Sequence, residues 1–360
     1  MKHLIDPTDL TREETDQIIA MAEDIIADRS KYQSVMAHRK LATLFYEPST
    51  RTRLSFTSAM MELGGNVLGF SDAKSSSVSK GETVQDTIRV VGCFADVIAM
   101  RHYIEGAPLA AAEVSAVPII NAGDGSHSHP TQTLTDLLTI KRELGHIGNI
   151  CIGFCGDLRF GRTVHSLIKA LSRYEGVRVI LIAPHELQLP DYIKQDVCEK
   201  MGIEYRETDN LDEVMPELDV LYMTRVQKER FLDEDEFDRV KDSFVLDSRR
   251  MALAKEKMAV LHPLPRVNEI LTEVDKDPRA AYFRQVENGK FVRMALICKL
   301  LEWKDDEKHP MPESEEPLLD ATLHCSNPKC ICNHEKNVQP RFRKSDNGTT
   351  RCWYCDSKVK

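Results

Sequence analysis

The seven residues Glu47–Arg53, Glu-Pro-Ser-Thr-Arg-Thr-Arg, combine hydroxyl and guanidinium groups that can hold an anion. They follow residues 40–46, an apolar stretch ending in aromatics that predicts a short buried strand, and they precede a helical pattern over residues 54–63. The first N–H groups of a helix lack internal partners, the helix dipole favours negative charge there, and arginine matches phosphate oxygens with two hydrogen bonds. The pattern therefore indicates a phosphate site. An ordinary Ser/Thr cap followed by solvated arginines would explain the same residues equally well.

Two further strand ends carry residues suited to the same chemistry. Arg101 follows the predicted strand 97–100. His129 and Gln132 come after the predicted strand 118–122 and a Gly-Asp-Gly turn. Ligands of open parallel sheets collect at the carboxyl ends of the strands, so these residues are candidates for substrate binding. Taken alone, Arg101 could instead be a solvated edge charge and His129 a structural histidine.

The second half of the chain repeats this alternation of strands and helices. A polar loop, residues 155–163, follows a predicted strand and contains Arg162. Arg225 and Gln227 come after another predicted strand, residues 218–223. The polar loop lacks the three-glycine fingerprint of dinucleotide-binding folds, so NAD binding is not expected.

Strands that alternate with helices predict parallel sheets, and we expect an α/β chain with two doubly wound domains. The first helix is expected over residues 8–29, with Thr8 as its cap, and residues 75–83 are expected to form a mobile surface loop. Other predicted elements are strands 66–70, 178–182, 244–246 and 259–261 and helices 83–94, 163–174 and 190–201. The expected domains are residues 1–133 completed by a last helix at 293–304, residues 134–292, an acidic linker 305–320 and a small C-terminal domain 321–360.

The loop 49–53, Ser-Thr-Arg-Thr-Arg, resembles the carbamoyl phosphate loop of the transcarbamoylases. With Arg101, the segment 129–132 and the sequence His-Pro-Leu-Pro-Arg at 262–266, it makes residues 1–304 similar to the catalytic chain of the aspartate carbamoyltransferase family. The resemblance implies the transcarbamoylase fold, carbamoyl phosphate and L-aspartate as substrates, and no cofactor for catalysis. The products would be N-carbamoyl-L-aspartate and phosphate, in de novo pyrimidine biosynthesis.

The resemblance also implies a role for each candidate residue. The phosphate would be held by Ser49, Thr50, Arg51 and Thr52, and the carbonyl oxygen by Thr52, Arg101 and His129. The carbamoyl NH2 would be bound by Gln132 and the backbone carbonyls of Pro263 and Leu264, and aspartate by Lys80, Arg162, Arg225, Gln227 and Leu264. Donors directed at an oxygen on which negative charge develops often make the largest single contribution to catalysis. The expected catalytic residues are therefore Thr52, Arg101, His129 and Lys80.

From the residues alone, the loop that contains Ser76 and Lys80 would be flexible and solvated. The resemblance implies instead that this loop reaches into the site of a neighbouring subunit, with Ser76 at the phosphate and Lys80 at both substrates. The expected active unit is then a homotrimer with shared sites.

Ornithine enzymes are the main alternative within the same group. They share the Ser-Thr-Arg-Thr-Arg loop but carry His-Cys-Leu-Pro where this chain has His-Pro-Leu-Pro at 262–265. Arg162 and Arg225 also suit the two carboxylates of aspartate, since each charged hydrogen bond is worth about 1.5–3 kcal/mol. The sequence therefore favours aspartate.

Five of the ten cysteines lie in the tail, residues 321–360. The pairs Cys325-x4-Cys330 and Cys352-x2-Cys355 form a four-cysteine pattern that predicts a structural Zn2+ site. Cys332 is surplus and could replace Cys330 as a ligand. A segment too small for its own core gains about 10–16 kcal/mol of apparent binding energy from such a metal. A disordered cysteine-bearing tail is the alternative.

The tail resembles the zinc domain of the aspartate carbamoyltransferase regulatory chain, which a separate nucleotide-binding domain precedes. Residues 305–320 leave no room for that domain, so control of this chain by ATP or CTP is not expected. We expect the tail to pack on its own or an adjoining subunit, stabilising the trimer or joining trimers. Its apolar anchors would be Ile331, Phe342 and Trp353.

The net charge of −9 is unevenly distributed: −8 over residues 1–304, −6 over 305–320 and +5 over 321–360. Basic residues and Trp353 in the tail would also suit a zinc-ribbon nucleic-acid-binding protein with an inactive enzyme body. Four thiolates with one Zn2+ reduce the tail to about +3, however, and the body is acidic, so no nucleic-acid partner is expected. No secretory signal or membrane-spanning run is visible, and the cysteines are expected to be reduced in the cytoplasm.

Overall fold

The structure, a computed structural model, describes residues 1–73, 77–227, 234–241, 243–304, 306–311, 316–345 and 348–359. Contacts divide the chain into two units. The first unit contains Met1–Thr131 and Gly289–Lys360, and the second contains Gln132–Asn288. The C-terminal segment thus groups with the first unit.

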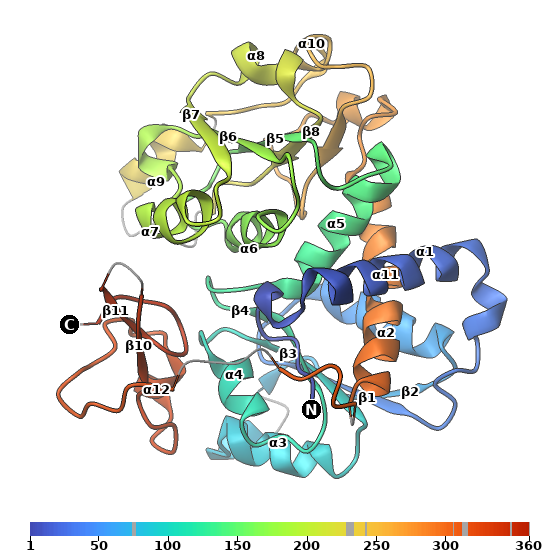
Figure 1. Ribbon diagram of the computed structural model, residues 1–360, viewed down its shortest axis with the longest axis vertical. Helices are drawn as coiled ribbons and strands as arrows, with labels where there is room; N and C mark the ends of the chain where they lie inside the picture. The colour runs from blue at the N-terminus through green and yellow to red at the C-terminus, as the bar shows by residue number, and fades with distance from the viewer. Residues whose placement is uncertain are drawn as a thin grey trace. The chain divides into compact units, whose positions relative to one another are not determined.

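A sheet of four parallel strands, in the order β2-β1-β3-β4, forms the centre of the first unit (Figure 1). The strands are β1 (Lys40–Phe45), β2 (Asn66–Phe70), β3 (Val97–His102) and β4 (Ile119–Asp124). β1, β3 and β4 are almost entirely buried, because their apolar runs lie in a parallel sheet covered on both faces. Their parallel pairing brings three carboxyl ends to one edge of the sheet.

The first helix begins later than the sequence predicted. α1 (Arg12–Ala27) starts after Thr11, whose hydroxyl accepts from the backbone N–H of Glu14 while the Glu14 carboxylate accepts from Thr11. This capping box makes Thr11 the cap, and Thr8 lies instead in a short 3-10 turn, Pro7–Asp9. The other helices of the unit are α2 (Thr50–Glu62), α3 (Val84–Gly92) and α4 (Ala107–Ala112).

Two helices continue from one unit into the other, α5 (Pro130–Leu144) and α11 (Tyr282–Glu302). α11 begins 11 residues before the predicted position 293. Within the first unit, Lys290 Nζ lies 2.6 Å from Glu62 Oε1 and Arg293 Nη1 donates to Ser55 Oγ at 3.2 Å. Both partners lie on α2, so this part of α11 packs beside α2 (Figure 1).

The second unit contains a sheet of five parallel strands in the order β7-β6-β5-β8-β9. The strands are β5 (Cys151–Cys155), β6 (Arg178–Ile182), β7 (Glu204–Thr208), β8 (Val220–Met223) and β9 (Ala259–Leu261). Its further helices are α6 (Arg162–Leu171), α7 (Asp191–Ile193), α8 (Leu211–Val214), α9 (Glu234–Val240) and α10 (Ser248–Met251). The doubly wound α/β fold predicted from the sequence is confirmed.

Three details of this unit differ from the predictions. The helix expected over 190–201 is divided into α7 and a π-helical turn, Lys194–Glu199. Residues 244–246 form no strand and contribute only a bridge from Leu246 to Ile270. β7 was missed because this edge strand is polar, Glu-Tyr-Arg-Glu-Thr, and charged residues are common on sheet edges.

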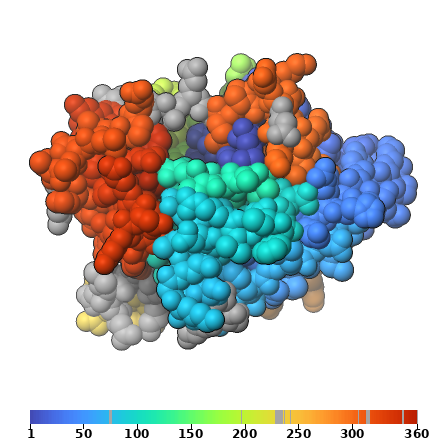
Figure 2. Space-filling model, turned by 90° about the horizontal axis from the view of Figure 1, so that it is seen from below, coloured from blue at the N-terminus to red at the C-terminus, as the bar shows by residue number. Residues whose placement is uncertain are grey.

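The C-terminal segment contains α12 (Ile331–His334) and an antiparallel pair, β10 (Phe342–Lys344) and β11 (Thr350–Cys352). It packs on the first unit of its own chain, beside α3 and α4 (Figures 1 and 2). Ile331, Val338 and Tyr354 belong to the same buried cluster as Ala107 and Ala111 of α4. Packing on its own chain is one of the two arrangements expected from the sequence.

Among the residues described, no helix combines the length and the apolar character needed to cross a lipid bilayer.

Candidate active site and metal centre

The predicted anion site lies where β1 ends and α2 begins. Ser49 is the N-cap of α2 in an extended conformation, and its side chain makes no capping hydrogen bond. Thr50, Arg51 and Thr52 form the first turn, with Thr52 buried and Arg51 exposed. A helix start whose cap side chain does not bond the first N–H groups leaves those donors for an anion. The local geometry therefore agrees with the sequence prediction.

Arg101 and His129 come to the same edge of the sheet as the start of α2. Arg101 pairs with Phe45, and its carbonyl accepts from the N–H of Tyr46, the residue before Glu47. β4 lies next to β3, so the turn after β4 is close to Arg101: Gly125 N donates to His102 O at 2.9 Å. His129 ends this turn, directly before α5. Three separate strand ends thus bring the residues predicted to bind phosphate and the carbonyl oxygen to one edge.

The positive charges at this edge lie close enough to affect one another. Partial burial and the nearby Arg101 charge lower the pKa of Arg51 below its ordinary value. Arg101 itself is mostly buried, with Nη2 3.3 Å from Glu47 Oε2 and Nη1 donating to Ala122 O at 3.4 Å. Two guanidinium groups in mutual repulsion are stabilised by a bound dianion, so the site is electrostatically prepared for a phosphate group.

In the second unit, Gln132 is linked to the 262–266 loop by a chain of hydrogen bonds. Gln132 Nε2 and Gln285 Nε2 both donate to Asp136 Oδ1, at 2.7 and 2.6 Å. Gln285 Oε1 accepts from the N–H of His262 at 2.9 Å. The loop residue Leu264 has a left-handed backbone, φ 52°, and donates its N–H to His262 Nδ1. Asp136 and Gln285 therefore fix the loop that carries the Pro263 and Leu264 carbonyls.

Three of the five residues predicted to bind aspartate are on loops after two neighbouring strands, β5 and β8. Arg162 opens α6, and Arg225 and Gln227 follow β8. Gln227 Nε2 donates to Phe160 O at 3.1 Å, which ties one loop to the other. All three side chains are partly exposed. The arrangement can present two guanidinium groups and an amide to a dicarboxylate.

Asp157 holds these two loops together. Its buried carboxylate accepts from the N–H of Phe160 at 2.9 Å and from the N–H of Gln227 at 3.3 Å. Its own N–H donates to Thr224 Oγ1 at 2.8 Å. Burial raises the pKa of Asp157 to about 6, although Arg159 and Arg225 lower it in part. Asp157 thus positions Gln227 and the Phe160 turn.

If these loops bind aspartate, as the resemblance implies, replacing Asp157 with alanine should raise the KM for aspartate about tenfold or more, because Gln227 and the Phe160 turn lose a charged acceptor worth about 1.5–3 kcal/mol. The KM for carbamoyl phosphate should change little. Steady-state kinetics with each substrate varied would measure both constants, and a melting curve would control for misfolding. Asp157→Asn, which keeps one acceptor oxygen, should be intermediate; equal effects on both substrates would contradict this role.

The loop predicted to reach a neighbouring subunit is only partly described. Ser76 lies outside the described residues. Lys80 is exposed at the end of a 3-10 turn, Ser77–Lys80, where the sequence had predicted a mobile loop. Its assigned role depends on a second subunit and stays a prediction.

The five tail cysteines form one cluster of thiols. The Sγ atoms of Cys325, Cys330, Cys332 and Cys352 all lie within 4.8 Å of one another. Cys355, predicted as a ligand, has its Sγ 3.6 Å from that of Cys325. All ten cysteines of the chain are free thiols. A compact set of buried thiolates is the donor set that structural Zn2+ prefers, and the residues fit such a metal.

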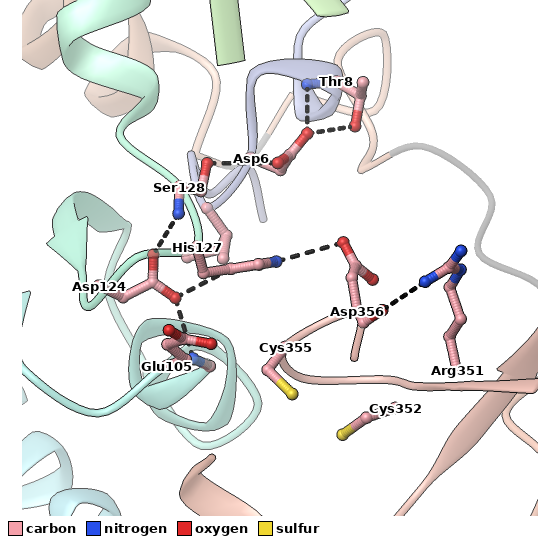
Figure 3. A network of polar contacts seen from close by, with 12 residues as sticks. Asp6, Thr8, Glu105, Asp124, His127, Ser128, Arg351, Cys352, Cys355 and Asp356 are labelled. Carbon is pink, nitrogen blue, oxygen red and sulfur yellow. Dashed lines mark hydrogen bonds and ion pairs between the residues drawn. The ribbon is translucent and has the colours of Figure 1, made fainter. Parts of the chain in front are cut away.

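A network of polar contacts joins this cluster to the turn that carries His129 (Figure 3). His127 lies between two carboxylates, with Nδ1 3.1 Å from Asp124 Oδ2 and Nε2 3.2 Å from Asp356 Oδ2. Although burial opposes it, the two charges raise the pKa of His127 well above its ordinary value. Asp356 directly follows Cys355 and also pairs with Arg343. Both ion pairs and apolar contacts therefore hold the C-terminal segment against the rest of the first unit.

Glu105 makes a second set of contacts between the tail and the same turn. Its backbone N–H donates to Lys329 O at 2.9 Å, and its carbonyl accepts from Ile331 N at 3.0 Å. Its carboxylate accepts from Asn327 Nδ2 at 2.6 Å and from Ser126 N at 3.1 Å. The next residue is a glycine at which a Cβ would come within 2.5 Å of the Tyr354 Cβ, so the close approach requires glycine there.

Sequence reasoning missed the residues that position the site. These are Glu105, Asp124, Asp136, Asp157, His262, Gln285 and Asp356. Asp124 ends β4 and Asp157 follows β5, each in a Gly-Asp pair, and this pair was the available signal for them. Gln285 and Glu105 lie in segments with no local feature that marks them.

Three protein-family models match successive parts of the chain. The carbamoyl-P binding domain of aspartate/ornithine carbamoyltransferase matches residues 2–142, and the Asp/Orn binding domain matches residues 148–300. The metal binding domain of the aspartate carbamoyltransferase regulatory chain matches residues 318–360. The two catalytic matches together cover most of the chain.

Curated relatives and solved structures agree with these matches. The aspartate carbamoyltransferase catalytic subunit of Lachnoclostridium phytofermentans is 61% identical over 301 residues, covering 84% of this chain and 98% of the relative. That of Clostridium botulinum strain Okra is 58% identical over 300 residues, covering 83% and 98%. The catalytic subunit of M. jannaschii aspartate transcarbamoylase has 48% identity and a TM-score of 0.79, covering 85% of this chain and all of that one. The Trypanosoma cruzi enzyme, solved with N-(phosphonacetyl)-L-aspartic acid, has 43% identity and a TM-score of 0.78, covering 82% and 95%.

Proposed function

Because the chain belongs to the aspartate/ornithine carbamoyltransferase family, we propose that it transfers the carbamoyl group of carbamoyl phosphate to the amine of L-aspartate. The observation that carries this proposal is the convergence of the α2 start, Arg101 and His129 at one sheet edge. The preference for aspartate is supported by the sequence His-Pro-Leu-Pro at 262–265 and by relatives named for aspartate. Its products are N-carbamoyl-L-aspartate and phosphate.

In this reaction the uncharged amine of aspartate attacks the carbonyl carbon. As the C–N bond forms, negative charge grows on the carbonyl oxygen, where Thr52, Arg101 and His129 donate. The C–O bond to phosphate then breaks, a proton of the amine passes to the departing phosphate, and that phosphate stays bound to Ser49–Thr52. No covalent bond to the protein is required, so positioning supplies much of the rate, up to about 7–11 kcal/mol.

The residues of the second unit bind the other groups of the substrates. Gln132 and the Pro263 and Leu264 carbonyls hold the carbamoyl NH2. Arg162, Arg225 and Gln227 hold the two carboxylates of aspartate. The structures of the Trypanosoma cruzi enzyme with carbamoyl phosphate and with aspartate support this choice of substrates.

The proposal can be tested by following phosphate release from carbamoyl phosphate by the purified full-length chain. Release should depend on L-aspartate and stay at the uncatalysed rate with buffer or glycine. If aspartate fails to stimulate release, the proposal is wrong.

We also propose that the active protein is a cytoplasmic homotrimer in which Ser76 and Lys80 complete the site of a neighbour. The residues around Lys80 are exposed, as a loop that serves another subunit must be. The tail is proposed to hold one Zn2+ that folds the segment docked on the first unit. The metal has a structural role and takes no part in the transfer.

Removing residues 305–360, or chelating the metal, is expected to lower the melting temperature by about 5–10 °C while turnover stays largely intact. The reason is the apolar area that Ile331, Val338 and Tyr354 bury against α4. Calorimetry and sedimentation would measure stability and oligomer size. Lys336→Ala, at an exposed tail position, is the matched control and should change neither. Unchanged melting and sedimentation after truncation would show that the tail does not stabilise the protein.

A further inference from the structure

The tail contains five clustered thiols, one more than a tetrahedral metal site uses. Building on the proposed Zn2+ site, we propose that the metal has two alternative ligand sets that share Cys325, Cys330 and Cys352. The fourth ligand is either Cys332 or Cys355. The sequence had raised Cys332 only as a substitute for Cys330, and the geometry instead makes it the alternative to Cys355.

The distances between sulfur atoms support both sets. Zn–S bonds of about 2.3 Å in a tetrahedron place the sulfurs about 3.8 Å apart. Cys330 Sγ lies 3.6 Å from Cys352 Sγ, an edge common to both sets. Cys332 Sγ lies 3.4 Å from Cys330 Sγ and 4.0 Å from Cys352 Sγ. Cys355 Sγ lies 3.6 Å from Cys325 Sγ. Cys332 therefore lies at ligand separation from Cys330 and Cys352 and within 4.8 Å of Cys325, and Cys355 lies at ligand separation from Cys325.

The shared ligands sit on backbone that is fixed from several sides. Cys330 forms a bridge with Glu105, Cys325 forms one with Val359, and Cys352 ends β11. The two alternative ligands sit on short segments next to them. Cys332 is half-buried in the single turn of α12, and Cys355 is buried in the turn that follows β11.

The choice of ligand affects docking, because Cys355 directly precedes Asp356 (Figure 3). Asp356 has a left-handed backbone, φ 59°, and contacts His127 of the first unit. A metal bond to Cys355 braces the turn that presents Asp356. When Cys332 is the ligand, that brace is absent, and the turn is held by contacts such as Asp356 N to Cys352 O at 3.1 Å and the pairing of Asp356 with His127 and Arg343.

The test replaces the native metal of the full chain with Co2+, whose thiolate charge-transfer absorption reports the number of bound cysteines. One Co2+ per wild-type chain tests the metal site itself. Cys332→Ala and Cys355→Ala should each keep one Co2+ and the full absorption, since the other cysteine takes the fourth position. The double variant should lose about one quarter of the absorption, as four thiolates become three. Cys352→Ala alone should show that same loss, and Cys93→Ala, an exposed cysteine of the body, should show none.

The outcomes separate the inference from the metal site on which it rests. If Cys355→Ala alone loses a quarter of the absorption or its metal, Cys355 is a fixed ligand and the inference is wrong. The same result for Cys332→Ala would make Cys332 the fixed ligand and would equally overturn it. If the wild-type chain binds no Co2+, the metal site fails as well. Serine variants at both positions, assayed for metal content and sedimentation, control for loss of folding.

Discussion

Replacing Arg51 with alanine is expected to lower kcat/KM for carbamoyl phosphate by about 10²–10³-fold, the effect of losing one donor to a developing anion. Arg51 lies in the first turn of α2, and partial burial together with the nearby Arg101 charge lowers its pKa, so the two guanidinium groups lie close enough to affect one another. Removing one of them weakens the binding of the phosphate group of carbamoyl phosphate. It weakens the stabilisation of that group still more as the group departs in the transition state. Initial rates over a range of carbamoyl phosphate concentrations would measure the loss.

Arg89→Ala is the matched control for this variant. Arg89 is exposed on α3 and pairs only weakly with Asp86, so its loss should leave kcat/KM within about twofold. Arg51→Lys should be intermediate, because lysine keeps the charge but loses the two-pronged geometry. An Arg51→Ala protein with near-native kinetics would remove the start of α2 from the phosphate site.

Mixing two inactive variants is expected to restore activity if the sites are shared. Arg51→Ala removes a phosphate contact from its own subunit's site, whereas Lys80→Ala removes a contact that the neighbour needs. Every mixed trimer then contains one site with both residues intact. Random exchange of equal amounts should therefore return about one quarter of the native activity. The measurement is turnover before and after subunit exchange.

Two controls make this experiment decisive. Exchange itself is monitored by mass spectrometry of intact trimers carrying differently sized tags. Mixing Arg51→Ala with His129→Ala should restore nothing, because both residues serve the site of their own chain. Confirmed exchange without recovered activity would mean that Lys80 acts only within its own subunit, or not at all.

The first-unit site could be predicted from sequence because each part of it is local. A strand, a Ser/Thr-Arg helix start and two further strand ends are visible as short patterns, and parallel topology brings strand ends together. The predicted helix starts were less accurate: Thr8 was predicted as the cap of α1 and residue 293 as the start of α11. At the start of α1 the capping box of Thr11 and Glu14 decided the boundary.

The contacts that hold the site could not be predicted in this way. Asp136 and Gln285 are 149 positions apart, and Gln285 lies in a helix with no marking feature. The contact between His127 and Asp356 spans 229 positions and depends on how the tail docks. The spacing of the cysteines likewise indicates how many ligands are possible. It does not indicate which sulfur atoms lie close together, as Cys332 shows. These features arise only from the folded chain.

The most direct test of the proposed function is a competition between amino acids. The full-length chain would be supplied with carbamoyl phosphate and equal concentrations of L-aspartate and L-ornithine, and the products would be identified by mass spectrometry. We expect N-carbamoyl-L-aspartate as the product, with citrulline at the level of an enzyme-free control. Citrulline as the main product would contradict the assignment of Arg162, Arg225 and the 262–266 loop to aspartate.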